Sequence, residues 1–200
     1  GRTAGRIASG RYQLNGQMYQ LPTTQGEHVL HGGLHAMSHQ LWQHRAEALD
    51  DGRAQVMFTL QSPAGENGHS GTLSVEVRYT LDDAQRLQID YSATTDAPTL
   101  CNLTHHSYFN LSGNAQRDVQ QHQLQVHANQ VCSMNEQLLV DGGTWAVDGS
   151  DFDCRQPKLL SEIVNSQDPR IELARGLDHY FVFEQADKTQ TQATLFDPES

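Results

Sequence analysis

The chain has 200 residues, of which 36% are hydrophobic and 18% are charged, and its net charge is −11 with histidines counted as neutral. That length fits one domain or part of a larger one. The acidic balance, spread along the whole chain, argues against binding to nucleic acid or to an anionic membrane surface, because both need basic patches.

Apolar and polar residues alternate with a period of two, which predicts three β-hairpins in the first half of the chain. In chain order they join Arg11–Leu14 to Gln17–Leu21, Trp42–Ala48 to Ala54–Gln61, and Leu73–Leu81 to Leu87–Ala93. The Asn15-Gly16 pair favours a type I′ turn in the first hairpin. The third hairpin is expected to bury one face.

The second half of the chain predicts strands at Gln123–Ala128 and His179–Glu184, and a short helix at Lys158–Val164. No linker-like segment divides the chain, so residues 1–200 are expected to form a single domain. Hairpins with few helices predict an all-β fold, namely an antiparallel β-sandwich.

No apolar run approaches the roughly 20 residues that a membrane span needs. The three cysteines, Cys101, Cys132 and Cys154, are an odd number at wide spacing and form no disulfide framework. A reducing compartment, the cytoplasm, is therefore expected.

Four segments are unusually rich in groups that can bind or react, and loops at strand ends are where an all-β scaffold usually carries function. They are GRTAGRIASG at 1–10, GEHVLHGGLHAM at 26–37, NLTHHSYFNL at 102–111 and GLDHY at 176–180. In the last of these, Asp178 is expected to reach a pocket from the start of a strand, the alternative being a solvated strand end. Arg2, Arg6 and Arg11, taken one by one, would be ordinary surface cations.

His28, His31 and His35 of the second segment and His39 just after it are spaced three, four and four apart. If the stretch were helical, they would form one metal-binding face. Paired glycines at 32 and 33 disfavour that helix. A scattered set on a solvated loop is the simpler interpretation. An intermediate interpretation keeps only His31, beside a Gly-Gly turn that would let the backbone approach a ligand.

His105 and His106 precede Ser107 in the third segment. A serine hydrolase is disfavoured, because the chain has no G-x-S-x-G elbow and adjacent residues rarely form a catalytic pair. In an extended segment neighbouring side chains point to opposite faces. One histidine is therefore expected to face the core or solvent, and the other a polar cleft suited to a sugar.

The ordered set of segments resembles the aldose 1-epimerases, or galactose mutarotases. GRTAGRIASG is similar to the family's GR-x-AN-RI-A-x-G segment, VLHGGLHAM to its LHGG segment, and SPAGENGHSG to SPDGE-x-G-(Y/F)-PG. NLTHHSYFNLSG is close to NLTNHSYFNLAG, GGTWAVDGSDFDCRQP resembles the G-x-F-D-F-R stretch, and GLDHYFVF resembles G-(Y/F)-DHNFVL.

The resemblance implies a β-sandwich with an open sugar cleft, and interconversion of the α and β anomers of an aldohexose such as galactose or glucose. It implies that His106 is the general acid and that His31 contacts the sugar near the ring oxygen. It also implies that Arg6 and Asp178 bind the sugar and that Tyr108 lines the cleft. Histidine suits this reaction because its ordinary pKa, near 6.5, lets it give and retake a proton at neutral pH.

The same resemblance implies no cofactor and no metal, and an aldohexose as the small-molecule partner of a monomer or homodimer. His105, Gly5 and Tyr180 stand where the family usually has Asn. The family's general base, a glutamate in a segment resembling CLETQ-x-x-PD, has no counterpart here, and Glu66 is the nearest substitute. We therefore expect a fragment truncated at both ends, and little or no catalysis by the chain alone.

Three other functions stay open from the sequence. The first is a non-catalytic sugar-binding protein on the same scaffold, and the second is a histidine-rich metal-binding β protein. The third is a hexose-phosphate 1-epimerase, which the acidic charge and the lack of a basic cluster near the motifs disfavour.

Overall fold

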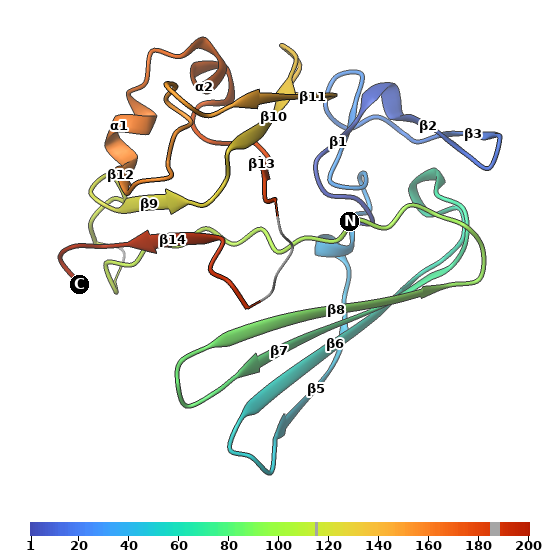
Figure 1. Ribbon diagram of the computed structural model, residues 1–200. Coiled ribbons are helices and arrows are strands. Elements are labelled where there is room, and N and C mark those ends of the chain that lie inside the picture. The colour runs from blue at the N-terminus through green and yellow to red at the C-terminus, as the bar shows by residue number, and fades with distance from the viewer. Residues whose placement is uncertain (115, 185–188) are drawn as a thin grey trace. The chain divides into compact units, whose positions relative to one another are not determined.

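The computed structural model describes residues 1–114, 116–184 and 189–200, in two compact units, Gly1–His105 and His106–Ser200 (Figure 1). The strand pairs of both units run antiparallel. The predicted all-β class is confirmed. That residues 1–200 form one domain stays a prediction.

The first unit is built from three antiparallel sheets, whose orders are β1-β4, β2-β3 and β5-β6-β7-β8. Hairpins connect the strands of the last two. Their bounds are β1 Arg6–Ile7, β2 Arg11–Leu14, β3 Gln17–Gln20, β4 Val29–Leu30, β5 Gln43–Ala48, β6 Ala54–Ser62, β7 Leu73–Leu81 and β8 Leu87–Thr95. Short 3₁₀ turns lie at Ala8–Gly10 (η1), Met37–His39 (η2) and Glu66–Gly68 (η3). All three predicted hairpins are confirmed.

The turn between β2 and β3 has the predicted geometry. Asn15 and Gly16 have φ values of 51° and 79°. Positive φ at both central residues is the signature of a type I′ turn, whose twist matches that of the strands it joins. The tight turn brings the Tyr12 and Tyr19 rings together, with centroids 5.0 Å apart.

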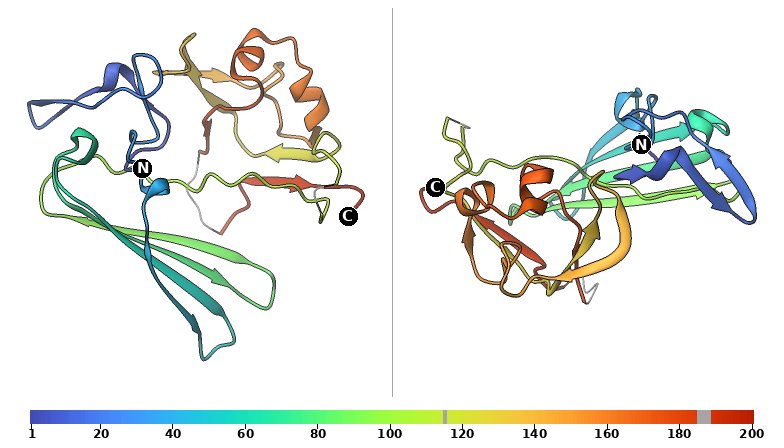
Figure 2. Two further views of the ribbon diagram at one scale, coloured as in Figure 1. Left: turned by 180° about the vertical axis from the view of Figure 1, so that it is seen from behind. Right: turned by 90° about the horizontal axis from the view of Figure 1, so that it is seen from above.

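Strands β5–β8 form a long twisted sheet (Figure 2). Its apolar face is buried only at one end. Leu73, Val75 and Val77 are buried, and Met37 packs against them. Near the opposite end, the side chains of Leu81 and Leu87 are 49% and 52% exposed. The predicted burial of a whole hairpin face is therefore wrong for β8, because the long ladder extends past the residues that cover its base.

The second unit holds two three-stranded sheets, of order β11-β10-β13 and β12-β9-β14. Their bounds are β9 Gln123–Val126, β10 Gln130–Met134, β11 Val140–Ala146, β12 Lys158–Leu159, β13 Phe181–Val182 and β14 Ala193–Phe196. Helices α1 Leu160–Val164 and α2 Pro169–Ala174 lie beside each other within this unit (Figure 1). The predicted strands at 123–128 and 179–184 are confirmed as the shorter β9 and β13.

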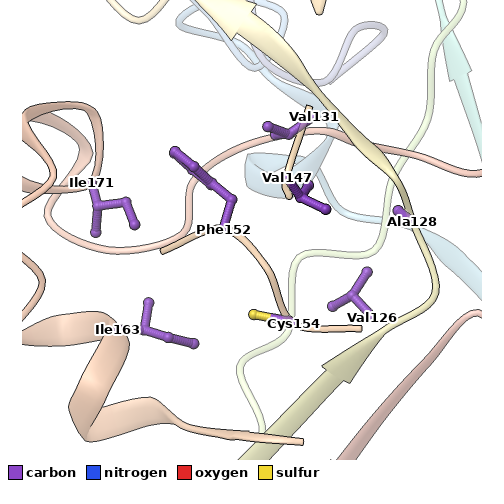
Figure 3. Packing of buried hydrophobic residues seen from close by; sticks show 8 residues of the cluster. All are labelled: Val126, Ala128, Val131, Val147, Phe152, Cys154, Ile163 and Ile171. Carbon is purple, nitrogen blue, oxygen red and sulfur yellow. The ribbon is translucent and has the colours of Figure 1, made fainter. Parts of the chain in front are cut away.

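A closed apolar cluster joins these elements (Figure 3). Phe152 is its largest member and is fully buried, with Ile163 of α1 and Ile171 of α2 packed around it. The other buried members are Val126, Ala128, Val131, Val147 and Cys154. Truncating a buried phenylalanine to alanine in such a cluster lowers the free energy of unfolding by about 3–5 kcal/mol. The cluster is therefore a main source of stability for the second unit.

The helix prediction at Lys158–Val164 is partly wrong, and a second helix was not predicted. Lys158 and Leu159 form a strand, and only Leu160–Val164 is helical. Helix α2 begins after Asp168, whose side chain accepts a hydrogen bond from the Arg170 amide, and Pro169 occupies its first turn. These are ordinary start signals, but the helix is too short to show a 3.6-residue period in the sequence.

Within the described ranges, none of the helices is long and apolar enough to cross a membrane.

Candidate functional site

The candidate site residues are divided between the two units. Arg6 and His31 belong to the first unit, and His106, Tyr108 and Asp178 to the second. Each group is described within its own unit.

In the first unit, the β1–β4 pairing brings Arg6 and His31 to neighbouring positions. Arg6 lies opposite Leu30, the residue before His31. The His31 amide donates to the Gly5 carbonyl over 2.9 Å, and the Gly5 amide donates to Nδ1 of the His31 ring over 3.3 Å. Since Nδ1 accepts, the proton of the neutral ring is assigned to Nε2.

The backbone after His31 turns sharply through Gly32 and Gly33. His31, Gly32 and Gly33 have φ values of 50°, 85° and 104°. A Cβ on Gly32 would lie 2.8 Å from the Arg2 amide nitrogen, and one on Gly33 would lie 2.9 Å from Cγ of Asn67. The two glycines therefore allow close contact with other parts of the same chain, namely Arg2 and Asn67, where the sequence suggested close contact with a ligand.

Arg6 is half-buried, and its Nε donates to Oε1 of Gln25 over 2.8 Å. The preceding residue, Gly5, has a φ of 69°. This left-handed conformation suits glycine, and asparagine is the commonest alternative to it. The conformation therefore accounts for a glycine where the resembling family has Asn.

The other histidines in and just after the second segment have separate surroundings. His28 is buried and its Nδ1 accepts a hydrogen bond from the Ser9 amide over 3.1 Å, whereas His35 and His39 are exposed. Across residues 1–114, 116–184 and 189–200, no three His, Cys, Asp or Glu side chains are grouped to hold a metal ion.

In the second unit, His106 and Tyr108 lie on one side of an extended segment, with ring centroids 5.4 Å apart. Both side chains are exposed, Tyr108 to 90%. His105 in the first unit packs edge-on against Tyr79, with centroids 5.9 Å apart. The two adjacent histidines thus have different ring neighbours, and His106 is the more exposed of the two. That one of them faces a sugar cleft stays a prediction.

Asp178 is exposed, and the residue after it anchors its segment to the core. The His179 ring meets the edge of Phe152 with centroids 4.6 Å apart. Burial lowers the pKa of His179, so its neutral form is favoured. The contact of the His179 ring with Phe152 thus holds the segment that carries the exposed Asp178.

The sequence prediction of a surface cation is wrong for Arg2, whose side chain is buried. Its guanidinium uses five N–H groups, donating to Oγ of Ser62, Oγ1 of Thr99 and the carbonyls of Ser62, Pro63 and Ser70. Ser62 also donates from Oγ to the Glu66 carboxylate. Burial lowers the pKa of Arg2, while the negative charge of Glu66 acts in the opposite direction.

Beside this network lies His69, which is 1% exposed and has no hydrogen-bond partner for Nε2 among the described residues. Burial, and then the positive charge of Arg2, lower the pKa of His69 to about 4. His69 occupies the aromatic position of the SPDGE-x-G-(Y/F)-PG pattern. A histidine in place of Tyr or Phe was the sequence feature that could have drawn attention to this residue. No feature of the sequence around Arg2 indicated that its side chain is buried.

The lowered pKa of His69 predicts a loss of stability in acid. Between pH 6.5 and 4 the unfolded chain protonates this ring and the folded chain does not, so the free energy of unfolding falls as the pH drops through that range. The full loss is about 3 kcal/mol, and about 2 kcal/mol of it is expected by pH 5. Urea unfolding at pH 7.5 and pH 5 measures it.

His69→Phe should remove this part of the pH dependence, because phenylalanine fills the position without a titratable group. His39→Phe, at an exposed position, should keep it. Equal pH dependence in wild type and His69→Phe would show that burial of His69 is not the cause.

A hollow of about 480 Å³ lies on the polar face of β5–β8. Hydroxyl, amide and carboxylate side chains line it, including Thr59, Glu76 and Ser92. None of the predicted site residues contributes to it.

Comparison with known proteins relates the chain to one family. The family model described as aldose 1-epimerase matches residues 1–200. Aldose 1-epimerase of Escherichia coli (strain K12) is 37% identical over 185 residues, which are 92% of this chain and 51% of that protein. Galactose mutarotase of Homo sapiens is 37% identical over 181 residues, 90% of this chain and 50% of that protein.

Solved structures agree with this relationship. Galactose 1-epimerase from Lactobacillus acidophilus NCFM superposes with a TM-score of 0.89 at 33% identity, over 98% of this chain and 56% of that one. An aldose epimerase homologue from C. elegans gives 0.85 at 28% identity, over 100% of this chain and 58% of that one. The predicted mutarotase-like fold is confirmed, and the chain spans about half the length of the curated relatives it matches.

Proposed function

This chain belongs to the aldose 1-epimerase family, and we propose that the protein carrying it interconverts the α and β anomers of an aldohexose such as D-galactose or D-glucose. The observation that carries the proposal within the chain is the contrast between two adjacent histidines. His105 packs against Tyr79, whereas His106 is exposed beside Tyr108. One imidazole of the pair is thus available for proton transfer.

Anomer exchange needs the hemiacetal ring to open and reclose. A proton goes to the ring oxygen, another leaves the anomeric hydroxyl, and the C1–O5 bond breaks to give an aldehyde. Rotation about C1–C2 and the reverse proton transfers then close the ring on the other face. We assign the proton given to the ring oxygen to His106. This sequence involves no net redox change, so it needs no redox cofactor.

The remaining candidate residues suit sugar binding. The Arg6 guanidinium and the Asp178 carboxylate form charge-assisted hydrogen bonds with hydroxyls, and His31 offers a ring whose Nδ1 is already engaged by the Gly5 amide. Tyr108 presents an exposed aromatic face. We propose that these four groups bind the sugar and that His106 transfers the proton.

Glu66 is a poor candidate for the general base. Its carboxylate accepts a hydrogen bond from Oγ of Ser62 and faces the positive charge of Arg2. These contacts engage the carboxylate in the hydrogen-bond network around the buried arginine. We therefore leave the base unassigned among residues 1–200.

Polarimetry of freshly dissolved α-D-galactose and α-D-glucose tests the proposal. The complete gene product is expected to speed the approach to the equilibrium rotation beyond the rate in buffer. Absence of acceleration with both sugars would overturn the enzyme assignment, and saturable binding without acceleration would favour a sugar-binding protein. Acceleration with α-D-glucose 6-phosphate alone would favour a hexose-phosphate epimerase.

A cytoplasmic location is likewise proposed. It is supported by three free cysteines, Cys101, Cys132 and Cys154, the last of which is buried.

A further inference from the structure

The segment that carries His106 lies in a long connection between β8 and β9 that contains no helix or strand in its described part. A segment without a ladder takes its conformation from side-chain anchors and isolated backbone hydrogen bonds. Two anchors lie at its C-terminal end. The Asn110 side chain donates to the Arg117 carbonyl over 2.8 Å, and the Leu111 amide donates to Nε2 of His122 over 2.9 Å.

His122 is well placed to serve as a fixed point. Its side chain is 0% exposed. Its amide donates to the Val119 carbonyl over 3.0 Å, and its carbonyl accepts from the Leu160 amide over 2.9 Å. It immediately precedes β9, the central strand of the β12-β9-β14 sheet. The ring is therefore attached to the sheet and to the start of α1.

The hydrogen bond to Leu111 accounts for the polarity of this buried ring. Because Nε2 accepts a hydrogen bond from the Leu111 amide, the neutral ring carries its own proton on Nδ1. Nδ1 is buried and has no hydrogen-bond partner among the described residues. A phenylalanine would fill similar space without burying that nitrogen, but it could not accept from Leu111. The acceptor is what the imidazole supplies.

We propose that His122 is a positioning residue for His106: by holding the Leu111 amide, it fixes the conformation of the exposed segment that presents the acid. This inference rests on the proposed function, since it assigns His122 a part in the anomer exchange. His122 is buried beneath the segment and does not contact the sugar.

Paired substitutions in the complete gene product test the role. His122→Gln keeps an acceptor oxygen near the position of Nε2, and His122→Phe keeps the ring without an acceptor. The Phe variant is expected to lose about 10- to 100-fold in kcat, the scale of a small misplacement of a reacting group, with little change in KM. The Gln variant should regain most of the activity. His127→Phe, at an exposed position nearby, should match wild type.

Amide hydrogen exchange at Leu111 supplies a readout that does not depend on activity. Exchange should accelerate in His122→Phe and stay close to wild type in His122→Gln. If His122→Phe does not fold, His122→Asn replaces it, because its shorter side chain buries the same amide group but places the oxygen away from Leu111.

The outcomes separate the two proposals. An inactive wild type overturns the proposed function. If amide exchange at Leu111 is also unchanged in His122→Phe, the proposal that His122 holds this amide is overturned as well. An active wild type with equally active Gln and Phe variants overturns the positioning role alone. Equal losses in both variants, in parallel with reduced stability, would show that His122 only supports the fold.

Discussion

His106→Ala in the complete gene product is expected to lower kcat for anomer exchange by about 100- to 10,000-fold, the range typical of losing a general acid. The ring is exposed on the same side of its segment as Tyr108, so alanine removes the proton donor with little loss of packing. Polarimetry with α-D-galactose measures the rate, and the melting temperature should change little.

His105→Ala is the matched control, one residue away. Its ring packs against Tyr79 in the first unit, so this variant should lose stability while keeping kcat within a few-fold of wild type. A large and equal loss of kcat at both positions would mean that the acid is not His106 alone. A loss confined to His105→Ala would reverse the assignment of the pair.

Arg2→Ala is expected to lower the free energy of unfolding by about 3–5 kcal/mol, because it leaves buried hydroxyls and carbonyls without their donor. Those acceptors lie in Ser62, Pro63, Ser70 and Thr99. Urea unfolding at neutral pH measures the loss. Arg2→Lys should recover only part of it, since an ammonium group has three donors at one point and cannot reproduce the planar fork.

Arg45→Ala is the control for Arg2. Arg45 lies on β5 with its side chain 71% exposed, and it pairs with Glu47. An exposed ion pair contributes about 0–1 kcal/mol, so this variant should unfold close to wild type. Similar losses at the two positions would show that the hydrogen bonds of Arg2 contribute no more than a surface pair.

The hairpins could be predicted because their signals are local. In β7, the alternation of apolar and polar residues along Leu73–Leu81 indicates a strand with one buried face. The Asn15-Gly16 pair favours the tight turn that it forms. Strands β10 and β11 escaped prediction because Cys, Ser, Asp and Gly interrupt their alternation, and their pairing contains a register shift between Cys132 and Met134. Strand β14 escaped because its alternation covers only four residues.

Candidate site residues could be predicted only in segments that resemble a motif of the family. The segment at 102–111 identified the histidine pair, and the structure gives its two rings different neighbours, Tyr79 for His105 and Tyr108 for His106. The roles of Arg6, His31, Tyr108 and Asp178 stay predictions. Arg2 and His122 could not be found from sequence. The partners of Arg2 lie 60 to 97 residues along the chain, and the contact of His122 with the Leu111 amide lies in a connection without a regular pattern.

The network around Arg2 also bears on how the protein is made. Arg2 donates to Thr99, which is 97 residues further along the chain, and the Ala4 amide donates to the Asn102 carbonyl. At translation rates of about 5–20 residues per second, the ribosome needs about 5–20 s to reach those partners. Throughout that interval the arginine lacks its full set of acceptors. The residues of this unit that are synthesised first are therefore among the last to take their native places.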